Sequence, residues 1–240
     1  MKLSTEQIDE LFAFTKKHYV EHYDLQLELV DHLSNGIEQQ WAVDPQLTFK
    51  DALAAEFKKF GVFGFMDVVE ARRKAMTRRY SKIIFQHMKK WFKLPQILLV
   101  VVATAAFYSL FQIKTFGKEV VALTAGVILI SWLVGLVLEF RRRKRNKKEK
   151  NNNTRIWMLE EMIGGLGSAY GIFMMPYYIM QPFIINDYDP SGRHPAVLVG
   201  VSFILALIII LYYVVYVEIP KKAREYLDEV YPEYRLIEKA

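Results

Sequence analysis

Hydrophobic and polar positions are distributed unevenly along the chain. Up to about residue 93, apolar residues recur every three or four positions among polar ones, which is the spacing of amphipathic helices. Four long apolar segments follow, and we place transmembrane spans at about residues 94–113, 120–138, 157–185 and 195–217. About 20 helical residues cross a bilayer core, and a soluble globule that buried four such helices would need far more chain. The pattern predicts an all-α protein, with a helical module followed by a four-transmembrane-helix bundle.

Local signals divide the first 93 residues into four helices. A capping box that begins at Ser4 starts the first helix, Asp24 is expected to cap the second, and Thr48 the third. Gly61 is a natural stop for the third helix. The fourth is expected to start near Phe65 and to run through a basic stretch into the first span.

Charge separates the segments outside the membrane. Residues 1–71 form an acidic module with thirteen acids and six bases, and residues 72–93 form a basic juxtamembrane helix with nine bases and no acid. A basic linker covers residues 141–155, and a tail covers residues 218–240. Bases beside spans favour anionic headgroups over nucleic acid as their partner. The candidate lipid-binding residues are Arg72, Arg73, Lys74, Arg78, Arg79, Arg141, Arg142 and Arg143.

The distribution of bases also predicts topology. The termini and the linker carry 23 Lys and Arg residues near the spans, against three in the other two loops. Bases near membrane ends favour the cytoplasm, so both termini are expected inside. The N-terminus has no apolar core of a signal peptide, so the first span is expected to act as an uncleaved anchor. The tail has the pattern of a short amphipathic helix that ends near Pro232 and is a candidate to dock on the module.

The stretch from His18 to His22 reads H-x-x-E-H, the inverted zinc-protease pattern. A zinc enzyme needs a third ligand and a rigid helix, whereas this motif lies where the first helix is expected to end. We therefore interpret both histidines as helix-end residues that pack against the second helix, with a catalytic or structural zinc site as the alternative. The chain has no cysteine, which excludes disulfides and thiolate chemistry.

Two segments carry a family resemblance, YDLQLELVDHLSNGIEQQW and FKDALAAEFKKFGVFGFMDVVEARR. They resemble the small helical, HAAS-type modules at the N-termini of bacterial multi-pass membrane proteins, which are common in uncharacterised Bacteroidetes proteins. The resemblance implies a signalling or protein-interaction role at the inner membrane. The candidate partner-binding residues are Glu28, Asp31, His32 and Glu38.

The third predicted span is the most unusual. It begins with Glu160 and Glu161, and ionisable residues within a membrane are candidates for function. Either they lie at the cytoplasmic interface near Arg155, or they form a site inside the bundle. Small residues permit close helix approach, within the bundle or in a homo-oligomer. These packing residues are Gly164, Gly167 and Gly171.

Three functions remain open at this point. The first is a non-catalytic regulatory or adaptor membrane protein whose module binds a protein partner. The second is a small transporter, channel or transporter subunit that uses the broken third span. The third is a membrane enzyme, but none of the five histidines lies within a predicted span. We favour the first, and expect no catalytic residues, no metal and no cofactor.

Overall fold

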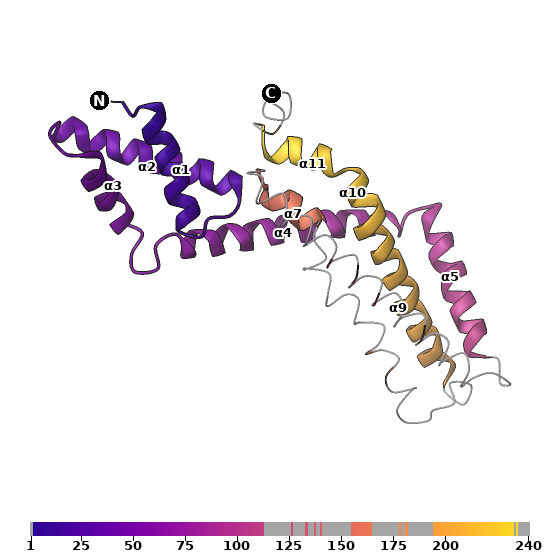
Figure 1. Ribbon diagram of the computed structural model, residues 1–240. Coiled ribbons are helices and arrows are strands. Elements are labelled where there is room, and N and C mark those ends of the chain that lie inside the picture. Colours follow the sequence, from indigo (N-terminus) through magenta and orange to yellow (C-terminus); the bar gives the residue numbers. More distant parts are fainter. Residues whose placement is uncertain are drawn as a thin grey trace. The chain divides into compact units, whose positions relative to one another are not determined.

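The computed structural model describes residues 2–112, 126, 133, 137, 140, 155–164, 178, 181, 194–232 and 234. Within these ranges every regular element is helical, so the all-α prediction is confirmed (Figure 1). Most of the second and third predicted spans lies outside the described residues, as do the linker bases Arg141, Arg142 and Arg143, and Gly167 and Gly171. The chain divides into two compact units. The first comprises residues 1–79, 150–161 and 231–240, and the second residues 80–149 and 162–230.

The first unit is built on three helices, α1 (Thr5–Lys17), α2 (Tyr23–Val43) and α3 (Phe49–Lys58). Helix α2 packs against both α1 and α3 (Figure 1). The predicted capping box is confirmed, because the Ser4 hydroxyl accepts from the Gln7 amide while the Gln7 side chain accepts from the Ser4 amide. Thr48 caps α3 as predicted. The core consists of Leu11, Val20, Leu25, Leu29, Val30, Leu33, Ile37, Trp41, Ala52, Leu53 and Phe65.

The second helix departs from its predicted start. It begins at Tyr23 with His22 at the N-cap position and no side-chain cap, so the prediction that Asp24 caps it is wrong. The Asp24 side chain is buried and does not cap the helix. Its carboxylate contacts Arg72, Met158 and Tyr231, which are all distant in sequence.

The fourth helix, α4 (Met66–Lys90), starts next to Phe65 as predicted but does not run into the first span. It ends at Lys90, and α5 (Gln96–Phe111) begins after Pro95. Proline restricts the residue before it and lacks an amide donor, which explains the break.

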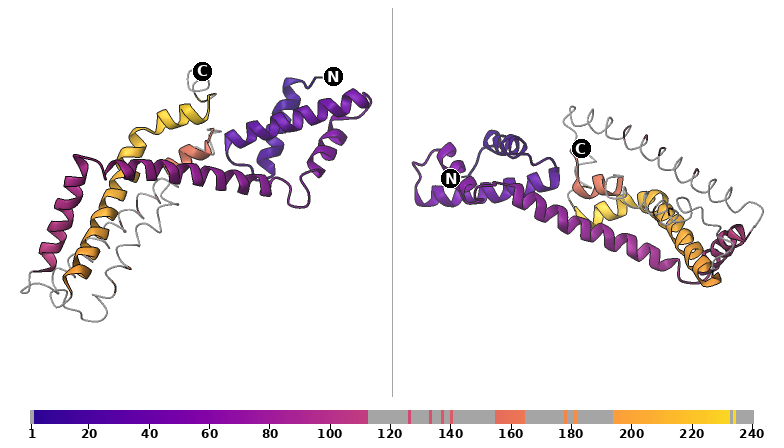
Figure 2. Two further views of the ribbon diagram at one scale, coloured as in Figure 1. Left: turned by 180° about the vertical axis from the view of Figure 1, so that it is seen from behind. Right: turned by 90° about the horizontal axis from the view of Figure 1, so that it is seen from below.

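In the second unit, α5 runs antiparallel to α9 (Pro195–Tyr213). The two helices lie side by side in both views of Figure 2. Phe111, at the end of α5, packs on Leu198 and Leu205 of α9, and Trp91 meets Tyr213 at the opposite end with ring centroids 5.7 Å apart. Helix α9 continues through a π-helical turn, η3 (Val214–Glu218), into α10 (Ile219–Lys221). The short α11 (Ala223–Val230) follows.

Among the described residues, one helix is long and apolar enough to cross a membrane. It is the 27-residue helix Pro195–Lys221, which contains the predicted span 195–217. Helix α5 is apolar but has only 16 residues. The described residues thus contain one candidate membrane helix in an all-helical fold, whereas the four-span bundle remains a proposal.

Candidate functional site: the α1–α3 groove and the Val62–Phe63 loop

A groove lies between α1 and α3 in the first unit. Its cavity volume is about 570 Å³. Most of its lining consists of Phe14, His18, Leu53, Ala54, Phe57 and Gly61. Three exposed charged residues complete the lining, namely Glu10, Lys50 and Lys58. An apolar floor with a few charged groups is the usual composition of a binding site in proteins.

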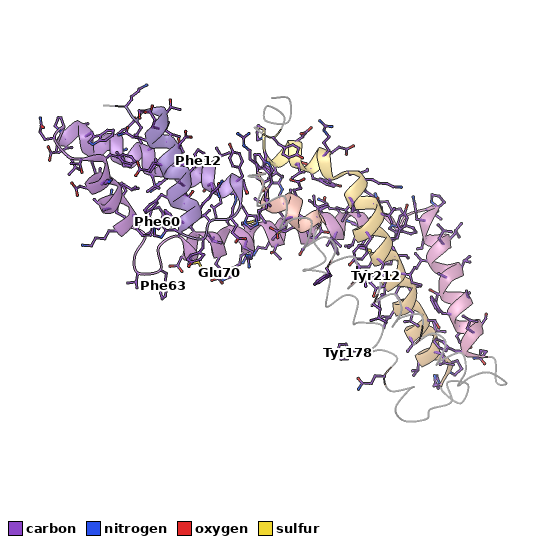
Figure 3. The ribbon with its side chains drawn as sticks, in the orientation of Figure 1. Phe12, Phe60, Phe63, Glu70, Tyr178 and Tyr212 are labelled. Atoms are coloured by element: carbon purple, nitrogen blue, oxygen red, sulfur yellow. The ribbon has the colours of Figure 1, made fainter. Side chains whose placement is uncertain are left out.

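The loop that follows α3 extends this apolar surface. Val62 is 98% exposed and Phe63 is 71% exposed, directly after Gly61 of the groove lining. Phe63 projects from the loop in Figure 3. Neighbouring large apolar residues this exposed, next to an apolar groove, are typical of a surface that contacts a partner.

Two glycines give the loop its shape. Gly61 and Gly64 have φ values of +78° and +55°, in the left-handed region that other residues rarely adopt. A Cβ on Gly64 would also lie 2.9 Å from the Phe57 ring. The glycines therefore turn the chain sharply on either side of Val62 and Phe63, and hold both side chains away from the core.

His18 belongs to the lining of the groove. Its ring packs against Phe14 and Phe57, with centroids 4.3 and 4.4 Å away. Burial, and then the nearby Lys17 charge, lower the pKa of His18 below its usual value. Aromatic neighbours and a lowered pKa both favour the neutral ring as a packing element.

The first unit also contains a buried polar cluster centred on Asp24. One Asp24 carboxylate oxygen accepts from the Met158 amide at 3.1 Å, and the other accepts from the Tyr231 hydroxyl at 3.0 Å. The Arg72 Nε lies 3.7 Å from the second oxygen. Burial, and then the Asp24 charge, raise the pKa of Tyr231, so its hydroxyl stays protonated and donates.

Aromatic packing surrounds this cluster. The Trp157 ring is 4.6 Å from that of Tyr231 and 5.5 Å from that of Tyr23, measured between centroids. The Arg155 guanidinium lies 4.9 Å above the Tyr23 ring, within cation–π range. The first residues of the third predicted span and Tyr231, which follows α11, therefore both contact the start of α2.

His22 joins the same region. Its Nε2 lies 2.6 Å from a carboxylate oxygen of Glu161, which is on α7 (Met158–Gly164). The Glu161 amide donates to the Trp157 carbonyl oxygen. The imidazole is largely buried, while the Glu161 side chain is 50% exposed. The described residues contain no group of three His, Asp or Glu side chains that could hold a metal ion. His22 thus serves as a contact between α2 and α7.

No family model matches this chain, and no curated protein or solved structure does so either. The resemblance to HAAS-type modules rests on the two quoted segments and stays a prediction.

The predicted partner-binding residues have local roles in the first unit. Glu28 is 3.5 Å from Arg72, and Asp31 accepts from Asn35. The His32 ring lies 5.6 Å from Phe60, away from the groove. A Glu38 oxygen accepts from the Leu3 amide, which fixes the N-terminal residues. Their binding role remains a prediction, on a different part of the surface from the groove.

The predicted lipid-binding bases of α4 divide into two groups. Arg72 is half-buried and directed at Asp24 and Glu28, so its charge is used within the first unit. The other four are exposed: Arg73, Lys74, Arg78 and Arg79. Lys74 pairs with Glu70 at 2.8 Å on the helix surface. Of the residues singled out in the third predicted span, Glu160, Glu161 and Gly164 all lie on α7.

Sequence reasoning missed two buried polar arrangements. In the first unit, the Glu56 carboxylate accepts from Gln40 at 2.6 Å and from Lys59 at 2.5 Å. In the second unit, the buried His87 ring contacts Glu218 through Nδ1 at 2.6 Å and the Tyr226 hydroxyl through Nε2 at 2.5 Å. Neither arrangement was evident from the sequence, because Gln40 reaches Glu56 from another helix and His87 is separated from Glu218 by 131 residues.

Proposed function

We propose that this protein is a non-catalytic membrane adaptor or regulatory protein, whose helical module binds a cytoplasmic protein partner in the α1–α3 groove. One observation supports the proposal most directly. The groove continues into a glycine-bounded loop that exposes Val62 almost completely and most of Phe63. Exposing large apolar side chains to water is unfavourable, and a partner that covers them recovers that free energy.

The composition of the groove defines the partner's chemistry. Phe14, Leu53 and Phe57 offer an aromatic and aliphatic floor, and two of the three charged lining residues are the bases Lys50 and Lys58. An amphipathic helix suits such a groove, with an apolar face against the floor and an acidic residue opposite the lysines.

Membrane anchoring is the second part of the proposal. We infer four spans with both termini in the cytoplasm of a bacterial inner membrane. The helix Pro195–Lys221 supports the last span, and the distribution of Lys and Arg supports the orientation.

The Asp24 cluster supports a regulatory role over simple anchoring. It bonds the start of α2 to Met158, which opens the third predicted span, and to Tyr231, which follows the last. A displacement of either segment would alter the helix that forms one wall of the module core. Through these contacts, partner binding and the membrane segments can influence each other.

Site-specific photo-crosslinking tests the partner proposal. The chain has no cysteine, so one introduced thiol can carry a benzophenone label at a single site. Ala54 lines the groove, whereas the adjacent Ala55 is exposed but does not line it. We expect the label on Ala54→Cys, in intact membranes, to form an adduct with one recurrent protein that mass spectrometry identifies, and Ala55→Cys to give little of it.

A second pair of variants makes the result specific. Lys50→Glu with Lys58→Glu should reduce the Ala54→Cys adduct, and Phe63→Ser should do the same without unfolding the chain, since Phe63 lies outside the core. Equal protein adducts from both labelled positions, or adducts with lipid alone at Ala54→Cys, would contradict a protein-binding groove.

A further inference from the structure

A second groove, in the second unit, lies between α5 and α9. Its cavity volume is about 440 Å³, and it is lined by Phe92, Ile97, Val100, Val101, Thr104, Ala105, Tyr108, Val199 and Phe203. Not one of these residues is charged. The two hydroxyl groups of the lining already have partners within α5 and at its end, because Thr104 donates to the Val100 carbonyl oxygen at 2.8 Å and Tyr108 accepts from the Gln112 side chain at 3.0 Å. A polar ligand would therefore find almost no partner in this groove, whereas a hydrocarbon chain would.

One end of the groove is basic. Phe92, which lines it, lies between exposed lysines, and the sequence from Ala71 to Ile113 contains no acidic residue. These lysines are Lys89, Lys90 and Lys93. The Trp91–Tyr213 ring pair lies at the same end, and such aromatic pairs are typical of the membrane–water interface.

The length of the groove fits one leaflet of a bilayer. Its lining on α5 extends from Ile97 to Tyr108. At a rise of about 1.5 Å per residue this is roughly 17 Å, close to half of a hydrocarbon core of about 30 Å. One acyl chain therefore fills the groove when its headgroup lies at the basic end.

We propose that this groove binds one acyl chain of an anionic phospholipid, whose phosphate contacts Lys89, Lys90 and Lys93. The proposal goes beyond partner binding by the module, and rests only on the insertion of α5 and α9 in the membrane. A second copy of the chain is a poorer occupant, because a symmetric contact here would bring two sets of three lysines together.

Native mass spectrometry of the full-length protein tests this assignment. The protein is reconstituted in nanodiscs of phosphatidylcholine and phosphatidylglycerol, extracted, and measured for retained lipid. We expect the unmodified chain to retain one phosphatidylglycerol in preference to phosphatidylcholine. Val101 lines the groove, and the neighbouring Val102 is exposed without lining it. Each methylene of the acyl chain that a larger side chain keeps out of the groove should weaken lipid binding about fourfold. Val101→Trp should therefore lower lipid retention about tenfold or more, whereas Val102→Trp should leave it unchanged.

A second arm tests the headgroup contact. Replacing all three lysines by glutamine should remove most of the preference for phosphatidylglycerol, by about fivefold per lysine, while the triple Lys→Arg variant keeps it. Ala105→Phe, which also fills the groove, must reproduce the loss seen with Val101→Trp, so that the result does not depend on one variant's folding.

Three results would overturn the proposal. The first is equal retention by Val101→Trp and Val102→Trp. The second is equal retention of the two lipids by the unmodified chain. The third is a dimer in the unmodified chain that becomes a monomer only in Val101→Trp, which would assign the groove to a second copy. Loss of the module's crosslinked partner would not change any of these measurements.

Discussion

Removing the Tyr231 hydroxyl tests whether the Asp24 cluster holds the first unit together. Tyr231→Phe deletes the donor to Asp24 at 3.0 Å but keeps the ring that packs on Trp157 at 4.6 Å. Tyr231 is 3% exposed, so water does not readily replace the lost hydrogen bond. The Asp24 oxygen would keep only Arg72, at 3.7 Å.

The expected effect follows from the charge of the acceptor. A hydrogen bond to a charged group contributes about 1.5–3 kcal/mol, and a buried acceptor left with one long contact loses most of that. We therefore expect the segment around Met158 and the start of α2 to open about 2 kcal/mol more easily. This corresponds to roughly thirtyfold faster amide exchange at these residues.

Hydrogen exchange followed by mass spectrometry, on the full-length protein in nanodiscs, measures this change peptide by peptide. Tyr19→Phe is the matched control, because Tyr19 is 78% exposed and the same hydroxyl is removed there. Its exchange should differ from the unmodified chain by less than about twofold, as for surface substitutions in general. Less than about threefold acceleration in the 155–161 peptide of Tyr231→Phe would show that the hydroxyl contributes little, and that aromatic packing alone fixes this segment.

Three further perturbations have defined outcomes. Gly36→Ala should lower the free energy of unfolding by about 1–3 kcal/mol despite alanine's helix propensity, because its Cβ would lie 2.4 Å from the Glu56 carboxyl. That carboxyl is held by Gln40 and Lys59. Thermal melts should show no such loss for Gly200→Ala, because nothing lies within 4 Å of a Cβ there. The lowered pKa of His18 means that the folded state binds this proton less readily, so its contribution to stability is complete above the ordinary pKa of about 6.5 and declines as pH falls below it. An NMR titration of His18 that gave an ordinary or raised pKa would refute this. His87→Ala should destabilise the second unit by about 2–4 kcal/mol, since the carboxylate and phenol on either side of the ring lose their shared partner, and a melt within about 0.5 kcal/mol of the unmodified chain would contradict it.

Local interactions were the part of the fold that the sequence predicted best. The caps at Ser4 and Thr48 depend on residues three positions away, so their sequence pattern is sufficient. The helical periodicity up to residue 93 likewise predicted that this region is helical, and α1 to α4 lie there. The break at Pro95 was missed, although the proline itself signals it, because the basic stretch resembles a continuous helix that leads into the span.

Long-range polar contacts were not predictable in the same way. Asp24 has the sequence context of a helix cap, but its partners are separated from it by 134 and 207 residues. The same holds for His22, which we interpreted as a helix-end packing residue with zinc binding as the alternative, and whose observed contact is Glu161, 139 residues away. The α1–α3 groove was also missed, since its floor has the same apolar pattern as a core helix face. Exposure of Val62 and Phe63 becomes evident only when the glycine-bounded loop is seen in three dimensions.

The two distant partners of Asp24 also set an order for the protein's biogenesis. The ribosome adds about 5–20 residues per second, so roughly 10–40 s separate the synthesis of Asp24 from that of Tyr231, which follows it by 207 residues. During this interval α1, α2 and α3 can form their apolar core, and the Arg72 and Met158 partners of Asp24 are made, but the Tyr231 hydroxyl donor is still missing. The first unit is completed only after the last apolar helix has left the ribosome. A chain interrupted before Tyr231 therefore keeps one Asp24 carboxylate oxygen without its hydroxyl donor beside that core.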